Sequence, residues 1–241
     1  KAISYSINRE EMVSAVYGRY TAAYGLVSPA ITLNGESYRA QVDEPIKAEY
    51  EQYAGNPEAL QELFQTGLDE LGVTTPMNEI TLTLLSYGST TENQLEREYI
   101  QQSLNQNLGI TVELNTVGDS DLFIARRDAL DYDIFLSSWY SDYNDPLDFL
   151  NIMKSGVYKS YGLYSNSEYD SMIDSLTGMQ DSAERLQTYS DLETLLLLDD
   201  CACAPIYYSD KHYYYQNWVQ DFRTSSFGAS QELYIASISG K

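Results

Sequence analysis

Apolar positions in the middle of the chain alternate between strand spacing and helix spacing. Alternation at every second residue predicts strands over 80–85 and 110–114, and a short apolar run predicts a third over 132–138. Between them, apolar residues three or four positions apart predict helices over 92–108 and about 119–129. This order predicts an α/β core of parallel strands that are joined by right-handed crossovers.

Helical spacing continues on both sides of this core. The further expected elements are helices over 1–17, 57–71, 167–176 and 182–198, and strands over 204–208 and 233–238. Asn8 and Asn56 stand where a side chain can cap the free N–H groups of a helix. Residues 21–50 are rich in Pro, Asn-Gly and small residues, and are therefore expected to form loops and turns.

The character of the chain changes abruptly after the third expected strand. Trp139 is followed by a polar cluster that consists of Asp142, Asn144, Asp145, Pro146 and Asp148. Pro146 suits a first helical turn that Asp145 can cap, and the helix dipole favours the charges of Asp145 and Asp148. Asp142 lies ahead of this helix, where a turn residue and a ligand-binding residue are equally good interpretations. Ligands of α/β proteins bind at the carboxyl ends of parallel strands. An aromatic side chain beside carboxylates there predicts a cationic, partly apolar ligand.

Acidic residues dominate the composition. The 241 residues include 36 Asp and Glu against 14 Lys and Arg, which gives a formal charge of −22. This charge repels phosphate backbones and anionic lipid head groups, so nucleic acid is not expected as a partner. Tyrosine occurs 23 times and Phe only 6 times. Wet apolar surfaces and a general preference for Tyr over Phe both explain this bias.

The sequence carries no signature of a catalytic or metal site. Neither a glycine-rich phosphate loop nor a GxSxG turn occurs, and no pair among the 36 acids stands out as catalytic. Cys201 and Cys203 are expected to be free thiols, because residues two apart on a strand lie near the upper distance for a disulfide. His212 is expected at the surface and supplies at most a third ligand, so neither a metal nor a cofactor is expected.

Four segments of the chain resemble one known family. They are AISYSINREEMVSAV (2–16), AYGLVSP (23–29), YDIFLSSWYSDYNDP (132–146) and APIYY (204–208). The third matches the family pattern around a Trp, an Asp-Tyr pair and an acidic residue before Pro almost position for position. In this order and spacing, the chain resembles the second half of the peptide-binding extracytoplasmic proteins of ABC importers, the oligopeptide- and dipeptide-binding type.

The resemblance implies a fold and a division of the chain. The fold would be a lobe of the type II periplasmic-binding-protein kind, with a mainly parallel sheet flanked by helices and with a second lobe closing over the ligand like a clamp. Residues 1–203 would form the second, C-terminal lobe. Residues 204–241 would cross back toward the first lobe, which the sequence does not contain.

The resemblance also implies a ligand site. The ligand-binding residues would be Asp142, Trp139, Ser137, Ser138 and Tyr140. In relatives that bind peptides, the Asp that matches Asp142 pairs with the free α-ammonium group of the ligand, and the strand before Trp139 runs alongside the peptide. Some relatives hold the peptide carboxylate with an Arg where this chain has Leu136, so recognition of the ligand's carboxyl end stays open.

The expected function follows from the same resemblance. The protein would be the extracytoplasmic, monomeric substrate-binding component of an ABC transporter, in the periplasm or lipid-anchored outside the cell membrane. It would capture peptides for a membrane permease and would not be an enzyme. The same architecture in relatives binds oligosaccharides, nickel chelates or opines, and the many tyrosines make a sugar the serious alternative. A glycoside hydrolase or an adhesion module is the alternative from another class.

Overall fold

A parallel sheet forms the base of the molecule. The computed structural model describes residues 1–157, 163–229 and 231–239. Strands β4 (Thr81–Tyr87), β5 (Thr111–Val117) and β6 (Ile134–Phe135) form a three-stranded sheet in the order β5-β4-β6. Both pairings are parallel, with Leu84 opposite Leu114 on one side and opposite Ile134 on the other. The prediction of parallel neighbouring strands is confirmed.

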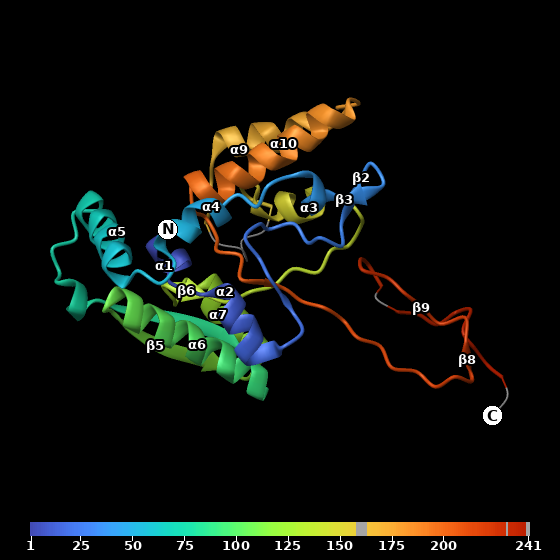
Figure 1. Ribbon diagram of the computed structural model, residues 1–241, viewed down its shortest axis with the longest axis horizontal. Helices are drawn as coiled ribbons and strands as arrows, with labels where there is room; N and C mark the ends of the chain where they lie inside the picture. The colour runs from blue at the N-terminus through green and yellow to red at the C-terminus, as the bar shows by residue number, and fades with distance from the viewer. Residues whose placement is uncertain (158–162, 230, 240–241) are drawn as a thin grey trace.

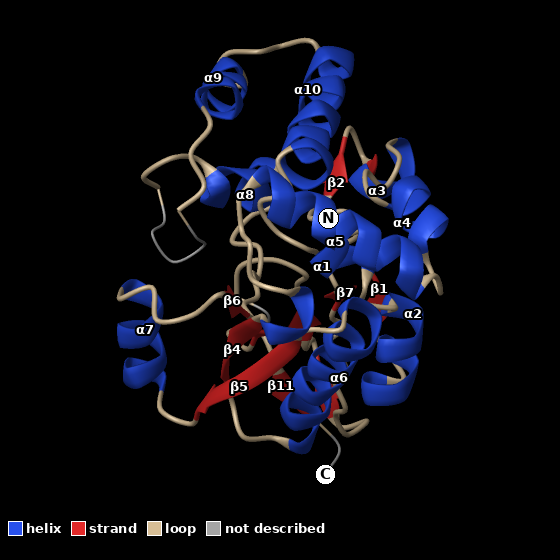
Figure 2. Cartoon of the chain, turned by 90° about the vertical axis from the view of Figure 1, so that its left-hand side faces the viewer, coloured by secondary structure: helices blue, strands red, loops and turns tan. Residues whose placement is uncertain are grey.

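Two crossover helices flank this sheet. Helix α6 (Thr91–Leu108) joins β4 to β5, and α7 (Ser120–Asp128) joins β5 back to β6 across β4. Because the strand order reverses after β5, right-handed crossovers place the two helices on opposite faces, as Figure 2 shows. Thr90 caps α6, and Gly109 ends it with a φ of 71° in the left-handed region. Both helices were predicted from periodicity and are confirmed.

Strand β6 is shorter than the expected strand 132–138. Only Ile134 and Phe135 pair as a strand, and the N–H of Leu136 adds one more bond to Leu85 O, at 3.0 Å. Beyond this point the chain leaves β4, and the Trp139 indole N–H donates to Asp148 of the next helix. The predicted strand is therefore correct in place and direction but wrong in length.

The N-terminal segment is not the single helix that its spacing predicts. It forms α1 (Ala2–Tyr5), α2 (Arg9–Met12) and the π-helical η1 (Val13–Tyr17), with a break between α1 and α2. The break has a cause in the buried guanidinium of Arg9, which donates to the carbonyl oxygens of Ser4 at 3.0 Å and Ile7 at 3.2 Å. A third bond, to Pro205 O at 2.8 Å, ties this segment to the C-terminal part. Asn8 caps α2, as predicted.

Residues 21–50 contain more regular structure than their turn-rich sequence predicts. The segment forms β1 (Thr21–Ala22), β2 (Thr32–Leu33), β3 (Glu36–Ser37), α3 (Tyr38–Gln41) and the start of α4 (Lys47–Tyr53). Tyr38 and Tyr50 are buried in the core and hold the two short helices in place. These contacts are long-range, so they cannot be predicted from local periodicity. Helix α5 (Pro57–Glu70), capped by Asn56, agrees with its prediction and packs on α6, and the short η2 (Met77–Glu79) follows it.

Helices of the second half cover the other side of the core. They are α8 (Leu147–Leu150), η3 (Asn151–Met153), α9 (Ser167–Ser175), α10 (Ser182–Thr194) and the π-helical η5 (Leu195–Asp199). Figure 1 shows α9 and α10 above α3 and α4, with the sheet and α6 at the opposite end. One continuous cluster of buried side chains joins the two ends, from Leu84 in β4 to Tyr169 and Leu192. The predicted helices over 167–176 and 182–198 are confirmed.

The C-terminal segment, which we define as residues 204–241, leaves the body of the molecule (Figure 1). Strand β7 (Tyr207–Tyr208) pairs antiparallel with β1, and β8 (Val219–Gln220), β9 (Arg223–Thr224), β10 (Gln231–Glu232) and β11 (Ser237–Ile238) form two antiparallel pairs. The strands expected over 204–208 and 233–238 are thus reduced to two residues each. No helix in the described ranges is long and apolar enough to span a bilayer.

Candidate functional site

The candidate site is the polar loop, which we define as residues 137–148. It begins where β6 ends, beside the carboxyl end of β4, and it runs into α8. All five residues that the sequence analysis proposed for ligand binding lie on it. Ser137, Ser138, Tyr140 and Asp142 are exposed, and Trp139 is half-buried against the core.

Two polar side chains of this loop anchor it to distant parts of the fold. The Asn144 amide exchanges two hydrogen bonds with Thr32 of β2, at 2.8 Å to its N–H and 2.6 Å to its hydroxyl oxygen. The Asp145 carboxylate accepts from the Tyr189 hydroxyl at 2.6 Å and forms an ion pair with Arg185 at 3.3 Å, both on α10. It also accepts from the first N–H of α8 at 2.9 Å, which confirms its predicted capping role. These side chains therefore build the fold.

Asp148 fixes the loop from within. Its side chain is buried, at 6% exposure, and its Oδ2 accepts from the Trp139 indole N–H at 3.0 Å and from the Asp142 backbone N–H at 2.9 Å. Asp148 was predicted only to interact with the helix dipole, and this prediction is incomplete. No periodicity could reveal the role, because both partners lie in irregular chain before the helix.

Asp142 differs from the other acidic residues of the loop. Its side chain is exposed, and the described residues offer its carboxylate neither a hydrogen bond nor an ion pair. Its neighbours Asp145 and Asp148 are both occupied by bonds to the fold. Among the described residues, the anchored loop thus presents a carboxylate without a protein partner, which is an arrangement that suits an external cation.

The C-terminal segment reaches the polar loop from the other side. The Lys211 ammonium lies 4.3 Å from the centre of the Tyr140 ring, and the Gly228 N–H donates to Ser141 O at 2.7 Å. Figure 1 shows the red segment that carries β9 turning back toward the body. Tyr140 remains 56% exposed despite the lysine. Neither contact could be predicted from a local pattern in the sequence.

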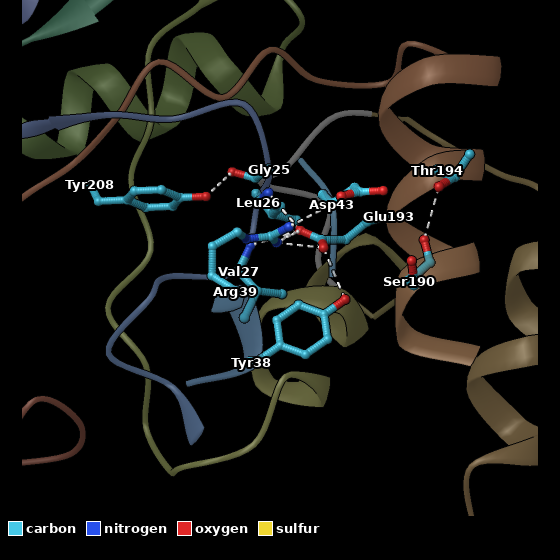
Figure 3. Close-up of polar contacts among 10 residues, drawn as sticks. All are labelled: Gly25, Leu26, Val27, Tyr38, Arg39, Asp43, Ser190, Glu193, Thr194 and Tyr208. Carbon is cyan, nitrogen blue, oxygen red and sulfur yellow. Dashed lines mark hydrogen bonds and ion pairs between the residues drawn. The ribbon is translucent and has the colours of Figure 1, made fainter. Parts of the chain in front are cut away.

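A second carboxylate, Glu193 on α10, contrasts with Asp142 in its burial and in its bonding. It is fully buried and accepts from the Leu26 and Val27 N–H groups at 2.7 and 3.0 Å and from the Tyr38 hydroxyl at 2.9 Å. Arg39 adds a buried ion pair (Figure 3). The AYGLVSP segment therefore serves the fold here, by wrapping a buried charge.

The cysteines, the histidine and the acidic groups show no metal site. Within the described residues, no three His, Cys, Asp or Glu side chains gather as metal ligands. Cys201 and Cys203 are free thiols. Burial raises the pKa of the Cys203 thiol to about 12, so it stays protonated at neutral pH. His212 is exposed on the C-terminal segment, as expected.

The fold and the position of the loop define a class of protein. A parallel sheet that carries an acidic loop at its carboxyl edge, with helices on both faces, is a lobe of the type II periplasmic-binding-protein fold. The profile of the bacterial extracellular solute-binding proteins, family 5, in its middle region, matches residues 1–161. The chain belongs to this family.

Proteins similar to this chain include members named for peptide binding and a solved structure with the same fold. The oligopeptide-binding protein OppA of Bacillus subtilis is 26% identical over 227 residues, which are 92% of this chain and 38% of that protein. The dipeptide-binding protein DppE of the same organism is 27% identical over 210 residues, 86% of this chain and 36% of that one. The peptide-bound OppA of Listeria monocytogenes superimposes with a TM-score of 0.81 at 25% identity, covering 100% of this chain and 44% of that chain. The chain thus spans about two fifths of the length of these relatives.

Proposed function

We propose that the protein with this chain is the extracytoplasmic substrate-binding component of an ABC importer and that it captures peptides. The observation that carries the proposal is the Asp142 carboxylate, which has no partner among the described residues and stands on a loop that Asn144, Asp145 and Asp148 anchor at the carboxyl edge of the sheet. Relatives that are named for oligopeptide and dipeptide binding support the same ligand class.

Each residue of the proposed site has a physical role. Asp142 pairs with the free α-ammonium group of the peptide, because an ammonium that loses its water on enclosure needs a charged acceptor. Ser137 and Ser138 offer backbone groups to the extended ligand just beyond β6. Trp139, tethered through its indole N–H, and Tyr140, open on its ring face away from Lys211, provide apolar contact area.

The chain supplies one side of the proposed clamp. Residues 1–203 act as the C-terminal lobe, and residues 204–241 cross toward a first lobe that the longer relatives have room for. Large exposed apolar side chains on the C-terminal segment support this division, since Tyr214 and Tyr234 are 95% and 80% exposed. The protein acts as a monomer outside the membrane, in the periplasm or on a lipid anchor. It delivers the peptide to a permease and catalyses no reaction.

An oligosaccharide is the second candidate ligand. Tyr140 and Tyr143 are both exposed on either side of Asp142, and aromatic faces stack well on sugar rings. In that case Asp142 would accept a hydrogen bond from a sugar hydroxyl instead of pairing with an ammonium.

A thermal-shift panel on the full-length protein separates these candidates. Ligands that bind only the native state raise its Tm, by an amount that grows with concentration over Kd. The panel contains peptides of two to eight residues, neutral oligosaccharides and nickel chelates. We expect Tm to rise with peptides alone, and a rise with oligosaccharides alone would overturn the proposal.

A further inference from the structure

The peptide unit between Ser141 and Asp142 is held at both of its polar ends. Its carbonyl oxygen accepts from the Gly228 N–H at 2.7 Å, and its N–H donates to Asp148 Oδ2 at 2.9 Å. The two partners come from elements far apart in sequence, since Asp148 is on α8 and Gly228 is in the turn between β9 and β10.

This double attachment restricts the direction in which the Asp142 side chain leaves the backbone. A peptide unit is a rigid plane, so its free rotation is about its own long axis. One hydrogen bond leaves much of that rotation available, whereas bonds to both the carbonyl and the N–H remove it. The orientation of this plane sets φ of Asp142, and with it the direction of the Cα–Cβ bond that carries the carboxylate.

Gly228 is adapted to its place on the loop. Its φ of +62° is in the left-handed region, and a Cβ added there would lie 3.1 Å from the backbone oxygen of Asp142. The close approach that allows the N–H to reach Ser141 O thus leaves little room for a side chain. Lys211, over the Tyr140 ring, holds the same loop at a second point from the same C-terminal segment.

We infer that Asp148 and Gly228 are positioning residues, which together aim the Asp142 carboxylate at the ammonium group of the ligand. The inference rests on the proposed function and adds to it a role for the C-terminal segment. That segment is then part of the binding apparatus, because it supplies one of the two bonds that orient the carboxylate. Loss of either bond lets the plane rotate and moves the carboxylate away from the ligand's ammonium.

The test measures selectivity instead of affinity alone. Calorimetry on the full-length protein gives Kd for one tightly bound peptide in its free-amino and N-acetylated forms. A carboxylate that points elsewhere loses the ammonium contact, so Gly228→Ala and Asp148→Ala should each lower the preference for the free-amino form by about tenfold. Affinity for the acetylated peptide should change much less in Gly228→Ala. Asp148→Ala also releases the Trp139 indole, so it lowers both affinities, and its readout is the ratio of the two Kd values.

Two further variants serve as controls. Gly72→Ala also places a side chain at a positive φ, of +68°, but its Cβ meets no described atom within 4 Å, so selectivity should not change. Asp148→Asn keeps an oxygen that accepts both N–H groups and should restore the preference that Asp148→Ala loses. If Asp148→Ala does not fold, Gly228→Ala decides the question by itself, because it changes an exposed turn.

The outcomes separate the inference from the function on which it rests. A wild type that prefers the free-amino peptide, together with variants that keep this preference, overturns the positioning role alone. A loss of affinity for both peptides by the same factor also overturns it, because that is the result of general damage to the fold. A wild type that binds both peptides alike overturns the proposed function and the aimed carboxylate together.

Discussion

Glu193 and Asp142 show two opposite uses of a carboxylate in one chain. Glu193 is buried and receives N–H donors from the loop at Leu26 and Val27, together with the Tyr38 hydroxyl and the charge of Arg39 from α3 (Figure 3). Asp142 is exposed, and its side chain receives no bond from the residues that the structure describes. A buried charge without partners would cost several kcal/mol, so Glu193 must be satisfied by the fold. An exposed charge keeps its hydration, so it needs no partner from the fold and is available to a ligand.

The same contrast separates two of the segments that carry the family resemblance. The AYGLVSP segment donates two backbone N–H groups to Glu193, which is a contribution to folding. The segment around Trp139 resembles the family at an exposed loop, which is where binding residues are placed. Resemblance alone does not distinguish these roles, and the bonding of each side chain does.

The largest expected effect is on stability. Glu193→Ala leaves the Arg39 guanidinium buried beside empty space, which should lower the free energy of unfolding by about 3–5 kcal/mol. Asp142→Ala removes an exposed charge and should change it by less than about 0.5 kcal/mol. Urea unfolding of both variants measures the difference. Equal losses would contradict the division into a folding carboxylate and a binding carboxylate.

A smaller effect is expected at Gly25, whose backbone lies against the Arg39 guanidinium. A Cβ added there would be 2.6 Å from the guanidinium carbon, and Glu193 prevents that group from moving aside. Gly25→Ala should therefore destabilise the protein by about 1–3 kcal/mol. Gly67→Ala is the matched control within α5, where nothing lies near the new methyl group, and it should stabilise by about 0.5–1 kcal/mol. A neutral Gly25→Ala would show that the guanidinium is not locked.

The smallest effect is a pH dependence from Cys203, which lies in the electrostatic field of Glu193. Burial first, and then this negative charge, raises its pKa to about 12 in the folded state, against about 8.5 when unfolded. The stability that the protonated thiol contributes is complete below pH 8.5 and is lost as the pH rises toward 12. Relative to Cys203→Ala, the wild type should lose about 1.4 kcal/mol between pH 7 and pH 9.5.

Subtracting the Cys203→Ala profile from the wild-type profile isolates the contribution of the thiol. Buried tyrosines such as Tyr38 also have raised pKa values, and they titrate equally in the wild type and in Cys203→Ala. Their contribution therefore cancels when the urea unfolding curves of the two proteins are subtracted at each pH. Parallel pH profiles for the two proteins would show that the thiol is not held protonated by the fold.

The regular core could be predicted from sequence because its determinants are local. Apolar periodicity located β4, β5, α6 and α7, and the side chains of Asn8 and Asn56 marked helix starts that the structure confirms. Helices α3 and α4 escaped prediction, because buried Tyr38 and Tyr50 gain their stability from contacts with distant segments. Strand β6 was predicted too long, since the apolar run 132–138 does not show which of its residues pair with β4.

The candidate site divides in the same way. Its proposed binding residues could be selected from sequence, because they form one short segment after a strand. Its supporting residues could not. Asp148 binds two N–H groups in irregular chain before its own helix, and Gly228 reaches the loop only through the path of the C-terminal segment. Such bonds depend on tertiary structure and leave no periodic trace.

The central claim is that the Asp142 carboxylate, which has no partner among the described residues, holds the ammonium group of a peptide. The most direct measurement compares wild type, Asp142→Asn and the charge control Asp121→Asn, an exposed residue of α7, in the full-length protein. Calorimetry records the affinity of each for one peptide in free-amino and N-acetylated form. Asp142→Asn should lose about 2–5 kcal/mol of binding free energy for the free-amino peptide, or roughly 30- to 5,000-fold in affinity, and far less for the acetylated peptide. Asp121→Asn should keep the wild-type affinity for both peptides. If all three proteins bind the free and acetylated peptides with the same preference, Asp142 is a turn residue and the claim is wrong.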